Sequence, residues 1–134
     1  MINEIDHIGI AVIDLDESIK TFQKLFQFTD VYREIVKDQK VEIASFKVGD
    51  VLIELTQAIS NDSPIAKYIK RKGEGIHHIA FKSDDVNNEL NRVEALGIKL
   101  VDKVAKNGAH NKLIAFLHPK STNGVLTEFC QDKE

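Results

Sequence analysis

The stretch Asp6-His7-Ile8-Gly9-Ile10 returns in altered form as His77-His78-Ile79-Ala80-Phe81. In each stretch, large apolar residues alternate with a histidine and a small residue: Ile8 and Ile10 with His7 and Gly9, and Ile79 and Phe81 with His78 and Ala80. This is the period-two pattern of a β-strand. A second pair, Val51-Leu52-Ile53-Glu54-Leu55 and Val125-Leu126-Thr127-Glu128-Phe129, repeats at nearly the same distance. His7 and His78 are 71 positions apart and Glu54 and Glu128 are 74 apart, so a loop difference of three residues reconciles the two pairs. The chain therefore reads as two copies of one module.

Each copy has the same predicted order of elements, namely a strand, a helix and three strands. In the first copy we expect a strand over residues 5–13, a helix over 15–27 with Asp14 as its capping residue, and strands over 28–36, 41–48 and 51–57. In the second we expect a strand over 76–82, a helix from Asp84 or Asp85 to Gly97, and strands over 98–104, 112–118 and 125–131. Between them, Ser63 caps a short connecting helix. We thus expect a single domain over 1–134, made of module 1 (5–57), a connector (58–75) and module 2 (76–131).

Composition limits the classes of protein that the chain can belong to. With 134 residues, 43% of them hydrophobic and 29% charged, it fits one soluble globular domain. The 18 Lys and Arg against 21 Asp and Glu leave a net charge of −3, which gives no field to attract nucleic acid or an anionic membrane. No run of 18 apolar residues and no signal-peptide pattern occurs, so we expect a cytoplasmic location. The single cysteine, Cys130, cannot form an internal disulfide.

The two repeated pairs place two histidines and two glutamates at equivalent positions. His7, Glu54, His78 and Glu128 each lie on the opposite side of their strand from apolar neighbours. An ionised carboxylate that is buried without a partner costs several kcal/mol. A divalent metal bound by all four would neutralise both carboxylates, and this mixed ligand set suits Zn, Mn, Co, Ni or Fe(II) better than Ca. The alternative is a water-exposed face on which His and Glu are ordinary neighbours, but the repetition of both residue types favours the metal.

With these residues in place, the duplicated module resembles the vicinal oxygen chelate superfamily, also called the glyoxalase/bleomycin resistance/dioxygenase superfamily. Within it, four runs are similar to the methylmalonyl-CoA epimerase family. They are residues 7–12, 63–67, 73–80 and 116–121, the last followed by Gly124-Val125-Leu126. The resemblance implies an α+β fold in which two tandem βαβββ modules pair into a cupped, mostly antiparallel eight-stranded sheet around a metal site.

The resemblance also implies the chemistry. It assigns His7, Glu54, His78 and Glu128 as ligands of one divalent ion, which is Co, Mn, Ni or Zn. It places a further glutamate, Glu42, in the cleft on the third strand of module 1. Glu42 and Glu128 would then act as base and acid, interconverting (R)- and (S)-methylmalonyl-CoA through α-proton abstraction and a metal-stabilised enediolate. A homodimer is expected from the family.

The implied substrate is a small acyl-CoA molecule, with neither nucleic acid nor a membrane as a partner. Its phosphates need cations. Lys120 and Ser121 are the first candidates, and the others are residues 70–72, Lys103, Lys106 and Lys112. Cys130 shares the face of Glu128, where we expect a buried small residue rather than a nucleophile.

Three other functions fit this fold. Lactoylglutathione lyase has the same four-ligand pattern and acts on a glutathione hemithioacetal, although residues 73–80 and 116–121 favour the epimerase. An extradiol dioxygenase normally has two His and one Glu around Fe(II), so Glu54 argues against it. A non-enzymatic small-molecule-binding protein would need no set of four ligands.

Overall fold

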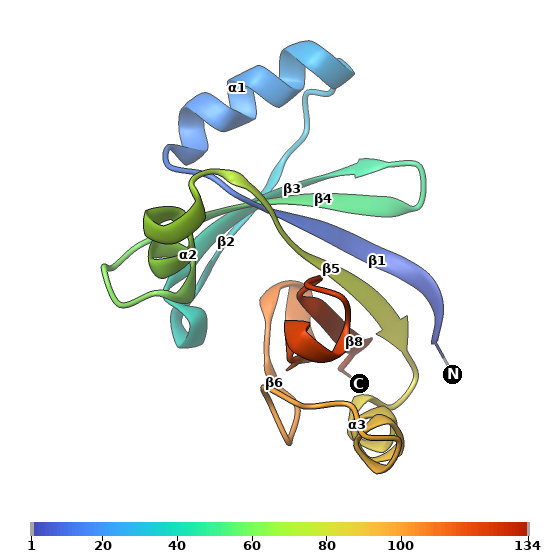
Figure 1. The fold of residues 1–134 in the computed structure, drawn as a ribbon. Coiled ribbons are helices and arrows are strands. Elements are labelled where there is room, and N and C mark those ends of the chain that lie inside the picture. Colours follow the sequence, from blue (N-terminus) through green and yellow to red (C-terminus); the bar gives the residue numbers. More distant parts are fainter. Residues whose placement is uncertain (1, 134) are drawn as a thin grey trace. The chain divides into compact units, whose positions relative to one another are not determined.

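The computed structural model describes residues 2–133, so that Met1 and Glu134, the ends of the predicted domain, lie outside the described residues. Its elements follow the order that the duplicated pattern predicts (Figure 1). They are β1 (Ile2–Ala11), α1 (Leu15–Phe26), β2 (Tyr32–Val36), β3 (Val41–Val48), β4 (Val51–Ala58), α2 (Pro64–Lys72), β5 (Gly75–Ser83), α3 (Val86–Ala95), β6 (Lys106–Asn107), β7 (Lys112–Leu117) and β8 (Thr127–Asp132), with short 3₁₀ turns at Lys37–Gln39, Ala109–Asn111 and Pro119–Ser121.

The strands pair in the order β2-β3-β4-β1-β5-β8-β7-β6. The pairs β2–β3, β3–β4, β6–β7 and β7–β8 are antiparallel, whereas β5 and β8 run parallel. This mixed eight-stranded sheet with three helices confirms the predicted α+β fold class. By its contacts the chain divides into two compact units: Ile8–His77, and the residues up to His7 together with those from His78 onwards.

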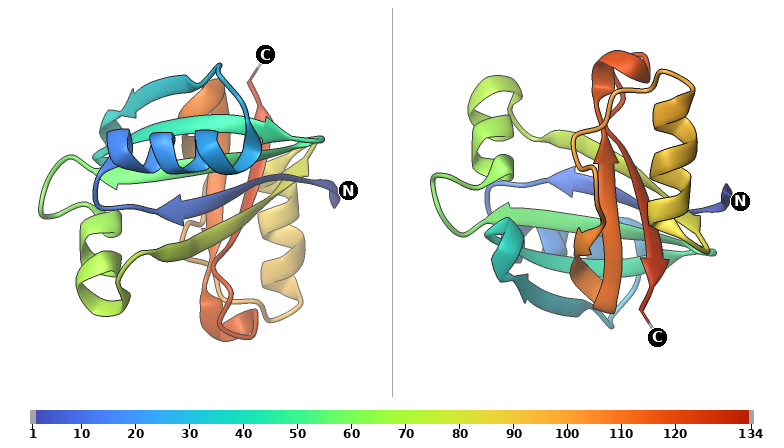
Figure 2. Two further views of the ribbon diagram at one scale, coloured as in Figure 1. Left: turned by 90° about the horizontal axis from the view of Figure 1, so that it is seen from above. Right: turned by 90° about the horizontal axis from the view of Figure 1, so that it is seen from below.

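In the unit Ile8–His77, α1 covers one face of β3 and β4 (Figures 1 and 2). The apolar residues at helical spacing on α1 meet those at period-two spacing on the strands. The pair Ala44 and Leu55 lies directly opposite across β3 and β4, and both are completely buried in this core. The next pair along, Ser45 and Glu54, points to the other face of the sheet. Glu54 is therefore buried away from the helix.

In the second unit, α3 packs against β7 and β8 (Figure 2). Leu90 on α3 is completely buried and belongs to one core with Ala115 and Phe129. Phe129 and Glu128 are neighbours on β8, so their side chains leave the strand on opposite faces. The helix-facing core thus directs Glu128 to the other side of the sheet.

Both modules begin their helix with the same two contacts. Asp14 and Asp85 each accept a hydrogen bond of 3.1 Å from the backbone N–H of the third helical residue, which confirms Asp14 as a cap and selects Asp85 over Asp84. Gln57 and Gln131, at the ends of β4 and β8, each accept a bond of 2.6 Å from the first helical N–H. The duplication therefore extends from the order of elements to single hydrogen bonds.

The prediction of a strand over 98–104 is wrong. Only Leu100 forms an isolated bridge there, to Leu117, and the strand of this region is β6 at Lys106–Asn107. The carboxylate of Asp102 accepts the backbone N–H of Phe116 at 2.8 Å, so a side chain takes the place of a main-chain carbonyl. This contact interrupts the regular ladder of a strand.

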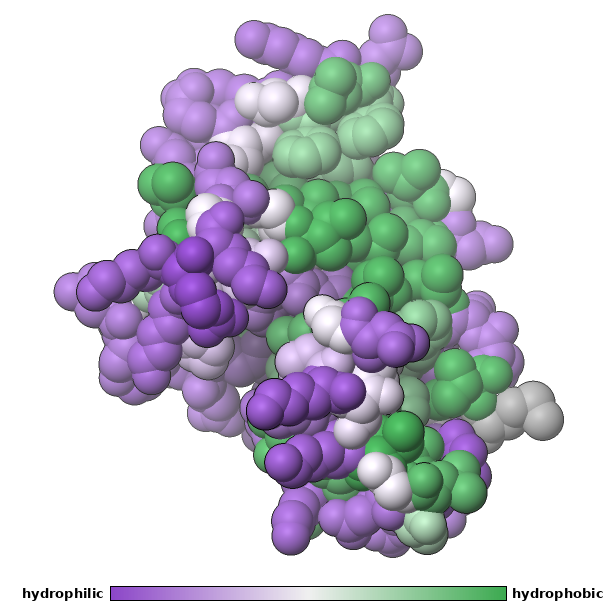
Figure 3. Space-filling view, in the orientation of Figure 1, coloured by the Kyte–Doolittle hydropathy of each residue, from purple (hydrophilic) through white to green (hydrophobic). Residues whose placement is uncertain are grey.

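The connecting helix α2 begins as predicted, with the Ser63 hydroxyl accepting the N–H of Ile65. Figure 3 shows strongly hydrophilic residues where Figure 1 places α2, and the last turn of this helix carries Lys70, Arg71 and Lys72. None of the helices within residues 2–133 has both the length and the apolar character that crossing a membrane requires.

Candidate metal centre

Three of the four predicted ligands meet within one unit. His7 comes from β1, His78 from β5 and Glu128 from β8, and they are only 5%, 6% and 2% exposed. The parallel register of β5 and β8 places Ala80 opposite Glu128, which sets His78 one pleat away on the same face. The repeated strand patterns thus converge as predicted for these three residues.

The donor atoms of these residues lie at the spacing of a metal coordination sphere. His7 Nε2 is 3.1 Å from His78 Nε2. The Glu128 carboxylate oxygens are 3.4 Å from His7 Nε2 and 3.5 Å from His78 Nε2. Ligand atoms about 2.1 Å from one ion, with angles of roughly 90–110° between them, are about 3.0–3.4 Å apart. Two imidazole nitrogens and two carboxylate oxygens, from three side chains, thus approach closely enough to fit a shared divalent cation.

Glu54 belongs to the other unit. It lies in the middle of β4, is 6% exposed and points away from the apolar core under α1. A buried carboxylate in this position has the orientation that the duplicated pattern predicts. Its part as the fourth ligand stays a prediction.

Beside the two histidines, apolar residues neighbour Glu128 on its face of the sheet. Phe116 lies directly opposite Glu128 across β7 and β8, and its ring meets that of His78 edge-on at a centroid distance of 5.5 Å. Ala80, Ile114 and Cys130 complete a small buried cluster on this face. These residues keep water from the candidate ligands, and electrostatic interactions are stronger in such surroundings.

Cys130 is completely buried, as expected for a small core residue. Burial raises the pKa of its thiol well above the ordinary value, and the charges of Asp6 and Glu128 raise it further. A thiol held in the protonated form is a poor nucleophile.

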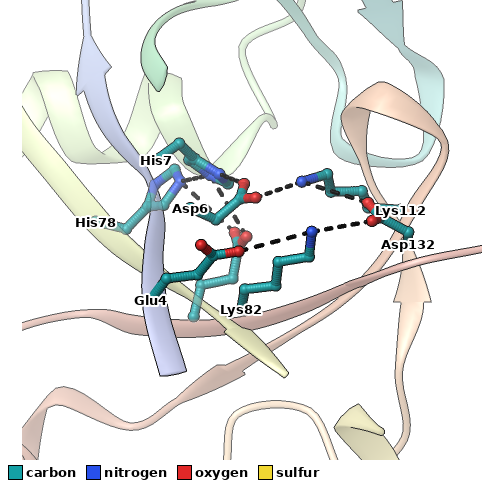
Figure 4. Close-up of polar contacts among 8 residues, drawn as sticks. Glu4, Asp6, His7, His78, Lys82, Lys112 and Asp132 are labelled. Atoms are coloured by element: carbon teal, nitrogen blue, oxygen red, sulfur yellow. Dashed lines mark hydrogen bonds and ion pairs between the residues drawn. The ribbon is translucent and has the colours of Figure 1, made fainter. Parts of the chain in front are cut away.

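Two residues at this site have no part in the predicted metal-ligand set. Asp6 Oδ2 lies 2.7 Å from Nδ1 of His7, and Lys112 Nζ contacts the other oxygen of the same carboxylate (Figure 4). Burial acts to raise the pKa of Asp6, but the hydrogen bonds from His7 and Lys112 outweigh it and hold this pKa well below its ordinary value. The only signal in the sequence was the aspartate that directly precedes the repeated histidine.

Glu42 lies on a different face of the sheet from Glu54. In the register of β3 and β4, Glu42 is opposite Gln57, and it shares the side of the strand with Ala44, which packs under α1. Its carboxylate accepts hydrogen bonds of 3.2 and 3.0 Å from the guanidinium of Arg33. As expected, the side chain of Glu42 lies on the opposite face of β3 from Val41 and Ile43. That face, however, is the one covered by α1.

Three of the residues predicted to contact the coenzyme A phosphates already have partners within the protein. Lys112 is buried against Asp6, so it is not available to a phosphate. Lys106 pairs with Asp102 at 3.1 Å. The Ser121 hydroxyl accepts the N–H of Lys99 at 2.9 Å, which gives it a structural role.

His77, which directly precedes His78 in the second repeat, packs edge-on against the ring of Tyr68 at a centroid distance of 4.9 Å. Burial, followed by the charge of Arg71, lowers its pKa to about 4. Both observations describe a neutral histidine packed within its own unit.

Comparisons with known proteins connect this geometry to a family. A model of the glyoxalase/bleomycin resistance protein/dioxygenase superfamily matches residues 6–116. The chain is 37% identical to the uncharacterized protein YqjC of Bacillus subtilis over 131 residues, which cover 98% of this chain and 94% of that protein. It is 35% identical to the mitochondrial methylmalonyl-CoA epimerase of Dictyostelium discoideum over 130 residues, which cover 95% of this chain and 77% of that protein.

Among solved structures, a variant of Streptomyces coelicolor methylmalonyl-CoA epimerase in complex with 2-nitronate-propionyl-CoA is similar with a TM-score of 0.93 and 32% identity. The match covers 98% of this chain and 96% of that one. These likenesses to epimerases confirm the prediction of an isomerase. The chain belongs to the glyoxalase/bleomycin resistance protein/dioxygenase superfamily.

Proposed function

We propose that this protein is a metal-dependent epimerase that interconverts (R)- and (S)-methylmalonyl-CoA. The observation that carries the proposal is the convergence of His7, His78 and Glu128 at 3.1–3.5 Å in a chain similar to methylmalonyl-CoA epimerases. Binding by two imidazoles and carboxylates suits Co, Mn, Ni or Zn.

The ligand set of the proposal is His7, His78 and Glu128, with Glu54 as the predicted fourth member. A divalent cation bound there supplies Lewis-acid stabilisation of the negative charge that develops on a carbonyl oxygen of the substrate. The residues hold their donor atoms in place through two packed cores, so little reorganisation is needed when charge develops.

Glu128 is the acid–base residue of the proposal. One of its oxygens takes the proton from the carbon between the thioester and the carboxylate, and the electrons of that C–H bond move toward the thioester oxygen. To give the other epimer, a second acid must return a proton to the opposite face of the planar carbon, and the resemblance assigns this part to Glu42. The apolar residues around Glu128 exclude water, which limits stray protonation of the intermediate.

Glu42 stays a prediction as the second acid–base residue, and it comes from the resemblance alone. The register of β3 and β4 puts it on the face opposite Glu54, so the geometry lends this assignment no support. The coenzyme A moiety, the homodimer and the cytoplasmic location also belong to the proposal. They rest on the family and on the sequence expectations, with Lys120 still a candidate for the phosphates.

Deuterium exchange tests the function directly. Co²⁺-loaded protein in deuterated water is expected to introduce deuterium at the α-carbon of methylmalonyl-CoA, and a chelator is expected to abolish it. Glu128→Gln keeps the size of the side chain but removes the base, and we expect exchange to fall by about 10²–10⁴-fold.

The same preparation separates the alternatives. Isomerisation of the methylglyoxal–glutathione hemithioacetal without exchange in methylmalonyl-CoA would replace the epimerase by lactoylglutathione lyase. Activity toward neither substrate, together with no bound metal by elemental analysis, would favour the non-enzymatic binding protein.

A further inference from the structure

We propose that Asp6 and Lys112 form a positioning pair for the candidate metal centre: Asp6 accepts the Nδ1–H of His7, which directs Nε2 toward the cation, and Lys112 holds Asp6 in place. The inference rests on the proposed metal site and deepens it. Neither residue touches substrate or cation in this scheme, so both act through His7.

The first step is the hydrogen bond on the far side of the imidazole. Asp6 Oδ2 is 2.7 Å from His7 Nδ1, a distance typical of a charge-assisted bond. A neutral imidazole that donates from Nδ1 has its lone pair on Nε2. That atom is the one that faces His78 Nε2 at 3.1 Å and Glu128 at 3.4 Å. The bond to Asp6 thus selects the tautomer and the ring orientation that a metal needs.

The second step concerns Asp6 itself. Its side chain is 8% exposed, and a buried carboxylate requires a compensating positive charge. Lys112 supplies it from β7 with a side chain only 11% exposed. A buried lysine is costly in its turn, and its direct contact with Asp6 is what makes both charges tolerable.

The third step separates the buried pair from the ion pairs beyond it. Asp132 forms ion pairs with two lysines: its Oδ1 lies 3.6 Å from Lys112 Nζ, and its Oδ2 lies 3.1 Å from Lys82 Nζ (Figure 4). Lys82 Nζ also lies 3.7 Å from Glu4 Oε1. Asp132 and Glu4 are 61% and 54% exposed, in contrast to Asp6 and Lys112. Exposed ion pairs contribute little to stability. Substitutions at Glu4 and Lys82 therefore serve as controls, because neither residue contacts His7 in these ion pairs.

The test measures Co²⁺ binding by the full chain at one pH, together with the ¹⁵N NMR signals of the His7 ring before metal is added. For the wild type we expect a protonated Nδ1 and an unprotonated Nε2. For Asp6→Ala we expect loss of this signature and a 10- to 100-fold weaker affinity for Co²⁺. Asp6→Asn retains an oxygen acceptor and is expected to lose less. Glu4→Gln and Lys82→Met, as matched controls, are expected to stay within about twofold of the wild type.

Unchanged Co²⁺ affinity and an unchanged His7 signature in folded Asp6→Ala would overturn the positioning pair. Asp6→Ala could fail to fold because Lys112 is left buried without its partner. In that case the double variant Asp6→Ala/Lys112→Met, which removes both charges, is tested instead. Unchanged Co²⁺ affinity and an unchanged His7 signature in this variant would likewise overturn the proposal. Failure of the proposed function gives a different result. In that case Asp6→Ala still weakens Co²⁺ binding, while the wild type exchanges no α-proton of methylmalonyl-CoA.

Discussion

Glu42 forms its hydrogen bonds with Arg33, which also donates to Asp16 on α1 at 2.7 Å. Because these contacts lie on the helix-bearing face, the register predicts that Glu42→Gln slows α-proton exchange by less than about threefold. Glu34→Gln, on the neighbouring strand β2, is the matched control. Exchange that disappears for one epimer of methylmalonyl-CoA in Glu42→Gln would instead establish Glu42 as the second acid–base residue.

Cys130 provides a second test at this scale. Since burial and then two neighbouring carboxylates raise the pKa of its thiol, the reactive thiolate is almost absent at pH 8. Native protein is therefore expected to resist iodoacetamide, and protein unfolded in guanidinium is expected to react fully, as followed by mass spectrometry. Rapid labelling of the native chain would show that the thiol is neither buried nor held protonated.

The individual site residues differ in how well the sequence could predict them. The convergence of His7, His78 and Glu128 was predictable because repetition marked them and strand alternation fixed their face. Asp6 and Lys112 were not, because they are 106 positions apart and only the pairing of strands brings them together. The face of Glu42 required the register of β3 with β4, since alternation alone does not tell which face carries the helix.

At the scale of elements, the glutamines at the ends of β4 and β8 stabilise the starts of two helices. Gln57 and Gln131 each accept the first helical N–H, a group that has no partner inside the helix. We expect Gln57→Ala and Gln131→Ala each to lower the free energy of unfolding by about 1–2 kcal/mol in urea denaturation. Lys24→Ala, at an exposed position of α1, is the control and should change it by less than about 0.5 kcal/mol. Equal stability of all three variants would contradict the role of these contacts.

The elements that the sequence predicted well are those with a strong period and a recognisable cap. Both long helices begin within two residues of their capping aspartates, as predicted. The region 98–104 has the apolar residues of a strand but lacks the ladder, because Asp102 bonds to the backbone through its side chain. β2 begins at Tyr32, four residues later than the strand predicted over 28–36. The apolar residues Phe28 and Val31 before it extended the predicted strand too far.

For the molecule as a whole, a metal that binds only the folded chain must stabilise it. At a Co²⁺ concentration of about 100 times the dissociation constant, the gain is roughly 2.7 kcal/mol, which is measurable as a higher midpoint of thermal unfolding. His78→Ala is expected to lose this shift, whereas His118→Ala, at the residue that caps the 3₁₀ turn Pro119–Ser121, is expected to keep it. A shift of equal size in both variants would mean that Co²⁺ binds elsewhere.

The duplication predicted the order of elements, the fold class and the paired caps, because each module repeats both the hydrophobic period and the positions of its polar residues. It could not predict which residues orient the ligands, since that depends on contacts made once, in one module only. His7 has Asp6 and Lys112 behind it, and this arrangement has no counterpart in the sequence around His78, where the preceding residue is His77.

The central claim is that two histidines and two glutamates from the two modules bind one divalent cation. The most direct measurement is anomalous X-ray scattering from a crystal of the Co²⁺-loaded protein. We expect a single strong peak about 2.0–2.2 Å from His7 Nε2, His78 Nε2 and carboxylate oxygens of Glu128 and Glu54. A cobalt peak away from His7, His78 and Glu128, or none at all in a loaded crystal, would contradict the account.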